Sequence, residues 1–77
     1  MNKERRARLD KVNTMIMDAL DILQEILDEE QEAYDNLPEG LQESERGEQM
    51  SEYIDILTDA HDYIEEQNEN LYEIING

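Results

Sequence analysis

The chain has 77 residues, 22 of them acidic and six basic, which gives a formal net charge of −16. A chain of this length forms one structural unit and lies near the lower limit at which a single chain buries enough apolar surface to fold unaided. It contains no cysteine, which excludes disulfides, thiolate metal sites and thiol nucleophiles, and its acidity disfavours direct binding to nucleic acid or to an anionic membrane.

The charge is segregated along the chain. Residues 1–11 carry five basic and two acidic residues, whereas the rest of the chain carries one basic and twenty acidic residues. The basic start is followed by an amphipathic stretch and therefore does not resemble a secretory signal, and the longest apolar run, Met15–Met17, is too short to span a membrane. We expect a soluble, cytoplasmic protein whose partners are basic.

Apolar residues predict a first helix over about residues 3–35. They alternate at spacings of three and four, which places them along one side of a helix as a seam. The seam positions are Leu9, Val12, Ile16, Ala19, Leu23 and Ile26, with Leu20, Leu27 and Tyr34 at the adjoining position.

Residues 36–43 are predicted to form the only turn. Leu37-Pro38-Glu39-Gly40 suits a type I β-turn, with proline second and glycine last. Ser44 is a candidate N-cap for the helix that follows. The chain is therefore expected to reverse its direction here.

A second amphipathic helix is predicted over about residues 44–75. Its seam positions are Met50, Tyr53, Leu57, Ala60, Ile64, Leu71 and Ile74, flanked by Ile54 and Ile75. The two helices have similar lengths and are joined by one short turn. This pattern indicates an all-α fold, a single antiparallel helical hairpin over residues 1–77.

The apolar part of each helix is wider than one partner helix would cover, because Ile22, Ile56 and Tyr63 extend it. We therefore expect two hairpins to pair into a homodimeric four-helix bundle. A monomer that offers its leftover apolar strip to a different protein is the alternative. The residues predicted to mediate self-association are Ile16, Leu20, Leu23, Leu27, Ile54, Leu57 and Ile64.

Carboxylates form two stripes at the same helical spacing. The longer stripe comprises Glu45, Glu48, Glu52, Asp55, Asp59, Asp62, Glu66, Glu69 and Glu73. The shorter stripe comprises Asp18, Asp21, Glu25, Asp28, Glu32 and Asp35. Like charges so arranged destabilise a helix by about 0.2–0.5 kcal/mol per pair. The stripes are either solvated faces, as most charged helix faces are, or a functional surface.

The functional interpretation is mimicry of nucleic-acid charge. Two stripes side by side give about one charge per 2.6 Å, against about one per 1.7 Å in duplex DNA. We expect an inhibitor that blocks a basic nucleic-acid-binding protein such as a defence effector, with the basic N-terminus neutralising the far end of the second helix. The predicted partner-binding residues are Asp21, Glu25, Asp28, Glu32, Asp35, Glu45, Glu48, Glu52, Asp55, Asp59 and Asp62. The alternative is a structural or assembly protein that associates through its apolar seam.

No motif in the sequence indicates an enzyme, a cofactor or a metal site. The carboxylates fall at expected solvent positions without a pocket that would tune an acid–base pair. His61 is expected at the edge of the seam beside a carboxylate, and Thr58 stands where a diiron Glu-x-x-His pair would need glutamate. The acidic run 28–39 lacks the glycine that an EF-hand needs at its sixth position.

The segment DEEQEAYDNLPEGLQESERGE, from Asp28 to Glu48, is followed by an acidic amphipathic helix. Together they resemble small acidic helical proteins of unassigned function that bacteriophages and related mobile elements encode. The resemblance covers about residues 20–64 and rests mainly on 34–39 and 41–44. It implies a phage or prophage setting, action in the host cytoplasm and interference with host machinery, and it implies no catalytic residue.

Overall fold

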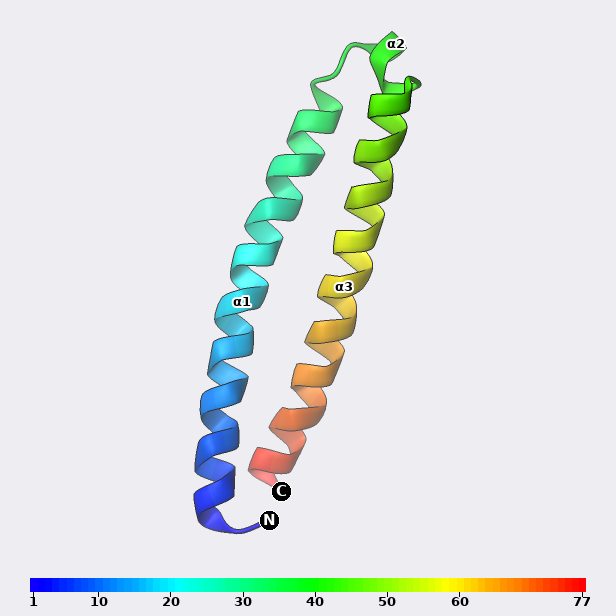
Figure 1. Cartoon of the computed structure of the whole chain (residues 1–77). Coiled ribbons are helices and arrows are strands. Elements are labelled where there is room, and N and C mark those ends of the chain that lie inside the picture. The colour runs from blue at the N-terminus through cyan, green and yellow to red at the C-terminus, as the bar shows by residue number, and fades with distance from the viewer.

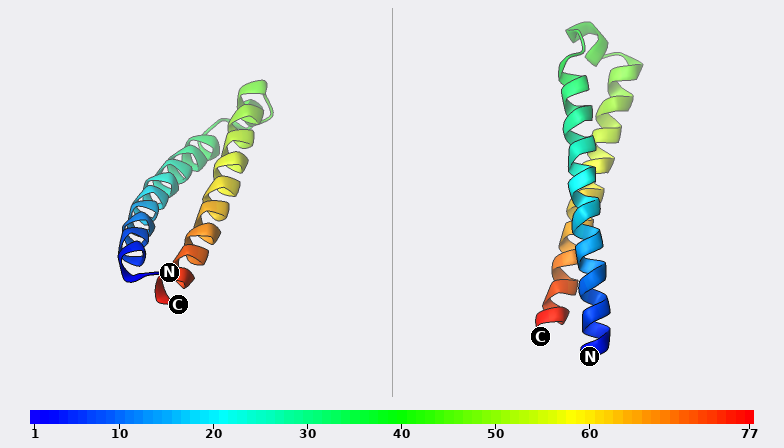
Figure 2. Two further views of the ribbon diagram at one scale, coloured as in Figure 1. Left: turned by 60° about the horizontal axis from the view of Figure 1, so that its bottom comes forward. Right: turned by 90° about the vertical axis from the view of Figure 1, so that its left-hand side faces the viewer.

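A computed structural model of the protein describes residues 1–77 and shows an all-α helical hairpin (Figure 1). Helix α1 spans Lys3–Asp35, the short helix α2 spans Glu39–Gln42, and helix α3 spans Glu45–Asn76. The hairpin measures 57 × 15 × 13 Å. Figure 2 shows that the two long helices cross at a shallow angle, with both chain ends at the pole opposite α2. The predicted hairpin and the predicted extents of its long helices are confirmed.

Both long helices begin at residues whose side chains cap them. The Asn2 side chain accepts a hydrogen bond from the Arg5 backbone N–H at 2.8 Å. The Ser44 hydroxyl accepts one from the Gly47 N–H at 3.4 Å, which confirms Ser44 as an N-cap. Each cap satisfies one of the N–H groups that have no partner within the first turn of a helix.

The predicted type I turn over 37–40 is wrong. Pro38 has φ −55° and ψ 144°, an extended backbone that precedes α2 instead of forming the second residue of a turn. Its carbonyl accepts hydrogen bonds from the N–H groups of Leu41 at 2.8 Å and Gln42 at 3.1 Å. Proline suits this position because it lacks an N–H that would need a partner. The Gln42 side chain donates back to the Tyr34 carbonyl at 3.2 Å and so ties α2 to the end of α1.

Gly47 lets the start of α3 approach α2 closely. It is one of the few buried residues, and a Cβ at this position would overlap the carbonyl oxygens of Gln42 and Leu41. Gly47 therefore has a structural role, since only glycine leaves room for this backbone contact.

The seam of α1 contains Leu9, Ile16 and Leu23 as predicted, but its other positions are shifted by one residue, which leaves Ala19 exposed and Leu20 buried. Val12 and Ile26, which were expected in the seam, are 44% and 43% exposed, while their neighbours Asn13 and Leu27 are buried. The residues of α1 that are at least partly covered follow an unbroken spacing of three and four: Arg6, Leu9, Asn13, Ile16, Leu20, Leu23, Leu27, Glu30 and Tyr34.

Helix α3 shows the same shift, since Tyr53 and Ile74 are exposed whereas Ile54 and Ile75 are partly covered. At each of these positions two adjacent apolar residues fit the helical spacing equally well. The packing of α1 against α3 covers the second residue of each pair. The covered residues of α3 are Gly47, Met50, Ser51, Ile54, Leu57, Ala60, His61, Asn68, Leu71 and Ile75.

The core between the helices is thin. Leu20 and Leu27 are its only buried apolar residues, each 8% exposed, and no side chain is fully buried. Most residues predicted to mediate self-association lie in this intramolecular seam and are covered within the same chain: Ile16, Leu20, Leu23, Leu27, Ile54 and Leu57. Ile64 remains 38% exposed at its edge. A second molecule would therefore have to contact other apolar residues.

None of the helices combines the length and the apolar character that crossing a membrane requires.

Candidate interaction surfaces

The two carboxylate stripes form two exposed ridges, one on each long helix. The α1 ridge comprises Asp18, Asp21, Glu25, Asp28, Glu32 and Asp35, and the α3 ridge comprises Glu45, Glu48, Glu52, Asp55, Asp59, Asp62, Glu66, Glu69 and Glu73. Every one of these residues is exposed. Because the spacing of three and four follows the helical repeat, each ridge places one carboxylate per roughly 5 Å of helix axis.

The ridges overlap only in the half of the hairpin nearest the turn. Asn13 lies opposite Asn68, so in antiparallel helices the α1 ridge, 18–35, runs alongside approximately 46–63 of α3. Nearer the chain ends α3 carries a ridge alone. The sequence-predicted partner-binding residues, from Asp21 to Asp35 and from Glu45 to Asp62, coincide with the overlap, where the charge density is about one per 2.6 Å.

The predicted neutralisation of the far end of α3 by the basic N-terminus is not found as ion pairing. The two salt bridges of the structure join Arg8 to Glu4 at 3.9 Å and His61 to Asp62 at 3.4 Å. Neither Glu69 nor Glu73 therefore pairs with a basic side chain. Glu69 and Glu73 are weaker candidates for target binding than the residues of the overlap, because no α1 ridge lies beside them.

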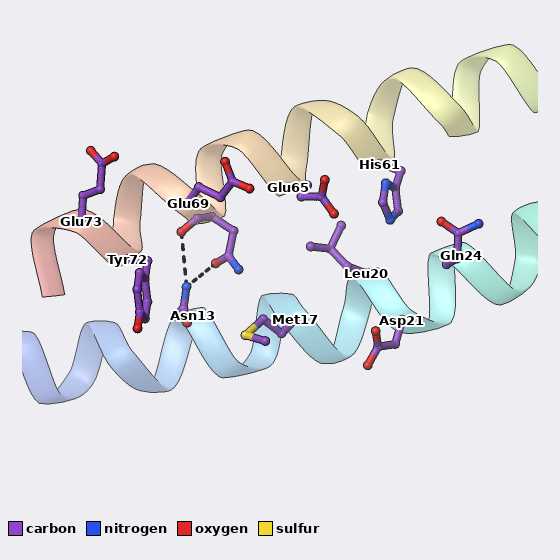
Figure 3. Close-up of a pocket in the computed structure, with 11 residues that line it drawn as sticks. Asn13, Met17, Leu20, Asp21, Gln24, His61, Glu65, Glu69, Tyr72 and Glu73 are labelled. Carbon is purple, nitrogen blue, oxygen red and sulfur yellow. Dashed lines mark hydrogen bonds between the residues drawn. The ribbon is translucent and has the colours of Figure 1, made fainter. Parts of the chain in front are cut away.

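A shallow groove runs along one side of the hairpin between α1 and α3 (Figure 3). Its lining is mainly polar and acidic, and it includes Asp21 of the α1 ridge together with Glu69 and Glu73 of the α3 ridge. Glu65 adds a further carboxylate. One residue of the α1 ridge and two of the α3 ridge therefore lie on this side of the hairpin, which we call the groove face.

Asn13 and Asn68 form a buried polar contact at the floor of the groove (Figure 3). The Asn13 side-chain amide donates to the Asn68 side-chain oxygen at 2.8 Å and to the Asn68 backbone carbonyl at 3.3 Å. The residues are 5% and 7% exposed. Sequence reasoning missed this pair, because asparagines interrupt the apolar pattern and nothing in the pattern links two residues 55 positions apart.

The opposite side of the hairpin carries exposed apolar residues from both helices, and we call it the apolar face. Its exposed residues are Val12, Met15, Ala19, Ile22 and Ile26 of α1, and Tyr53, Ile56, Tyr63 and Ile74 of α3, with the partly covered Ala60 among them. Ile26 of α1 and Ile56 of α3 line one common apolar depression, which shows that the two strips belong to the same side of the molecule. No charged residue of α1 falls on this strip between Val12 and Ile26.

The structure brings no three His, Asp or Glu residues together in a group that could hold a metal ion. His61 lies at the edge of the seam as expected, with its side chain 13% exposed. Its Nδ1 contacts the adjacent Asp62 carboxylate, and its ring lines the groove.

Comparisons with protein-family models, with curated proteins and with solved structures find no match for the chain.

Proposed function

We propose that the protein is a non-enzymatic acidic interaction protein that binds a basic, nucleic-acid-binding protein and competes with its nucleic acid. The observation that carries the proposal is the overlap of the two exposed ridges, which together place about one carboxylate per 2.6 Å of hairpin axis, within a factor of two of the axial charge spacing in duplex DNA. Such a surface fits a Lys/Arg channel that normally holds a nucleic acid.

Residues 20–64 resemble acidic proteins of phages and mobile elements, and we therefore propose a phage or prophage origin for the protein. In this setting the protein acts in the host cytoplasm as an inhibitor of a host protein, for example a defence effector. The target supplies the cationic groups, and the protein supplies no reaction chemistry.

We further propose that two copies pair through their apolar faces to form a four-helix bundle. The ridge residues Asp21, Glu69 and Glu73 line the groove and not the apolar depression, and every ridge residue is exposed, so pairing through the apolar face would leave carboxylates free to contact a target. A homodimer would therefore carry its apolar residues inside and its charges outside.

Displacement of proteins from DNA-cellulose tests the binding proposal. Bacterial lysate proteins are retained on the column at low salt, and the acidic protein is then applied as the eluent. The wild type is expected to elute specific basic proteins, identified by mass spectrometry. Replacement of four central ridge residues, Asp55→Asn, Asp59→Asn, Asp62→Asn and Glu66→Gln, should abolish elution. Raising the salt concentration should weaken capture of the eluted proteins by the immobilised wild type.

The matched control removes the same number of charges outside the ridges, at the exposed residues Glu4, Asp10, Glu39 and Glu43. This variant should elute as the wild type does. Equal loss in both variants would show that bulk charge acts rather than the ridges, and full elution by the ridge variant would contradict the proposal.

A structural or assembly protein is the second candidate function, and the exposed apolar face favours it. In that case the partner is another helical protein that packs on this face, and the carboxylates only keep the assembly in solution. Association of this kind would be nearly independent of salt, because burial of apolar surface drives it.

A further inference from the structure

The elongated hairpin exposes more surface than a compact chain of its mass. The chain exposes 6035 Å², whereas a compact monomer of its mass exposes about 4,900 Å². A pair of copies that covered this excess of about 1,100 Å² on each chain would bury roughly 2,000 Å², which is the size of a specific protein–protein interface.

The α1 strip of the face is nearly symmetric about the middle of the helix. Ala19 is the central residue of α1, and Val12 and Ile26 lie seven residues on either side of it. When one copy is turned end over end, Val12 of each copy would lie beside Ile26 of the other, and such reciprocal contacts define an isologous interface.

The charges at the two ends of the face differ in sign. Arg8 continues the α1 strip eleven residues before Ala19. Glu30 lies eleven residues after Ala19 at the edge of the seam, where it is partly covered and lines the apolar depression. Arg8 is largely exposed and makes only a 3.9 Å contact with Glu4 within its own chain. Glu30 takes part in no salt bridge.

We propose that two copies dock apolar face to apolar face with their turns at opposite ends, so that Arg8 of each copy lies beside Glu30 of the other. The proposal rests on the proposed homodimer and specifies its orientation. The reverse arrangement, with both turns at one end, would bring the acidic turn ends of the two copies together, and like charges there oppose association. The alanines at the centre allow α1 to approach α1 of the partner closely.

This orientation places the two regions of overlapping ridges at opposite ends of the dimer. Each copy contributes one acidic surface near its own turn, and the two surfaces lie far apart. The dimer would therefore present two separate target-binding surfaces. A target assembly with two binding sites would bind the dimer more tightly than a monomer, because the first contact raises the effective concentration of the second surface.

Distance measurement between spin labels tests the orientation. The chain has no cysteine, so one introduced cysteine carries one label. A label at Glu43→Cys, in the exposed turn, should give an interspin distance of the order of the 57 Å length of the hairpin. Turns at the same end would give a distance below about half that value and would overturn the proposal. A label at Asp18→Cys, near the middle of α1, reports dimer formation in either orientation.

A charge swap provides the second test. Arg8→Glu should raise the dimer dissociation constant roughly tenfold, because it sets like charges opposite each other twice per dimer. The double variant Arg8→Glu/Glu30→Arg should restore the wild-type constant, whereas Glu4→Gln should leave it unchanged. Failure of the swap to restore association would contradict the orientation. Absence of any interspin distance together with a monomer mass in sedimentation would contradict the homodimer itself.

Discussion

At the scale of single residues, the Asn13–Asn68 contact does the most to define the structure. It is the only buried pair of polar side chains in the seam, and the short amide contact forms when these two residues lie opposite each other. A shift of one helix along the other would leave both amides buried without partners, which costs more than the hydrogen bond itself contributes. The pair therefore fixes the register of a seam whose other residues are largely interchangeable aliphatic side chains.

Truncation of Asn13 tests this role. We expect Asn13→Ala to lower the free energy of unfolding by about 1–3 kcal/mol, because the Asn68 amide loses its partner in the seam. Urea denaturation followed by circular dichroism measures the change. The matched control is Asn70→Ala, two residues from Asn68 and exposed, which should change stability by less than about 0.5 kcal/mol. Equal effects of the two variants would show that the buried contact contributes nothing.

The same residues show what the sequence could not predict. Asn13 and Asn68 were missed because a pattern of apolar residues marks a seam only where the seam is apolar. Their pairing depends on which residues of α1 and α3 face each other, and periodicity within each helix does not contain that information. Ser44, by contrast, was predictable, since capping depends on local sequence alone.

At the scale of elements, the long helices were predicted to within one or two residues because their apolar spacing is regular and their caps are strong. One line of each predicted seam was shifted by one position, because adjacent apolar residues such as Ile26 and Leu27, or Tyr53 and Ile54, fit the helical spacing equally well. The short helix α2 was missed because four residues are too few to show a period. The ridges were predicted correctly as exposed, because a continuous charged stripe has no place in a seam.

The junction of α2 and α3 yields a prediction at this scale. Gly47→Ala should destabilise the protein by about 1–3 kcal/mol, because the added methyl group meets the carbonyl oxygens of Gln42 and Leu41. Gly40→Ala is the matched control. This residue has open space where the methyl group would go, and alanine should stabilise α2 by up to about 1 kcal/mol.

Thermal unfolding monitored by circular dichroism measures both variants. The melting temperature should fall for Gly47→Ala and stay equal or rise for Gly40→Ala. If the melting temperature changed in the same direction and by the same amount in both variants, helix propensity would explain the changes. The close contact at Gly47 would then make no contribution to stability.

At the scale of the whole molecule, the hairpin is a thin structure with two unlike sides. The seam between its helices buries only Leu20 and Leu27 among apolar residues, and the apolar face remains open. A 77-residue chain with so little buried surface gains stability from anything that covers the open side. The acidic groove face opposes association of two copies, so the proposed pairing would use the apolar face.

Two exposed residues of similar size distinguish the two sides. Ile22, on the apolar face, is 58% exposed, and Met17, which lines the groove, is 55% exposed. Ile22→Gln should weaken self-association by roughly tenfold in dissociation constant and lower the melting temperature at a given concentration, because it places an amide in the interface. Met17→Gln should change neither quantity appreciably. Sedimentation equilibrium and melting curves at several concentrations measure them, and equal behaviour of the two variants would contradict pairing through the apolar face.

The topology of the hairpin also sets the order in which it opens. Residues that face each other near the turn are close in sequence, whereas the Asn13–Asn68 contact joins positions 55 residues apart. The entropy lost on closing a loop grows with its length, so contacts next to the turn form most readily and those at the pole of the chain ends fray first. The overlap of the two ridges lies in the half that stays closed longest. Local opening at the chain ends would therefore leave the proposed binding surface in place.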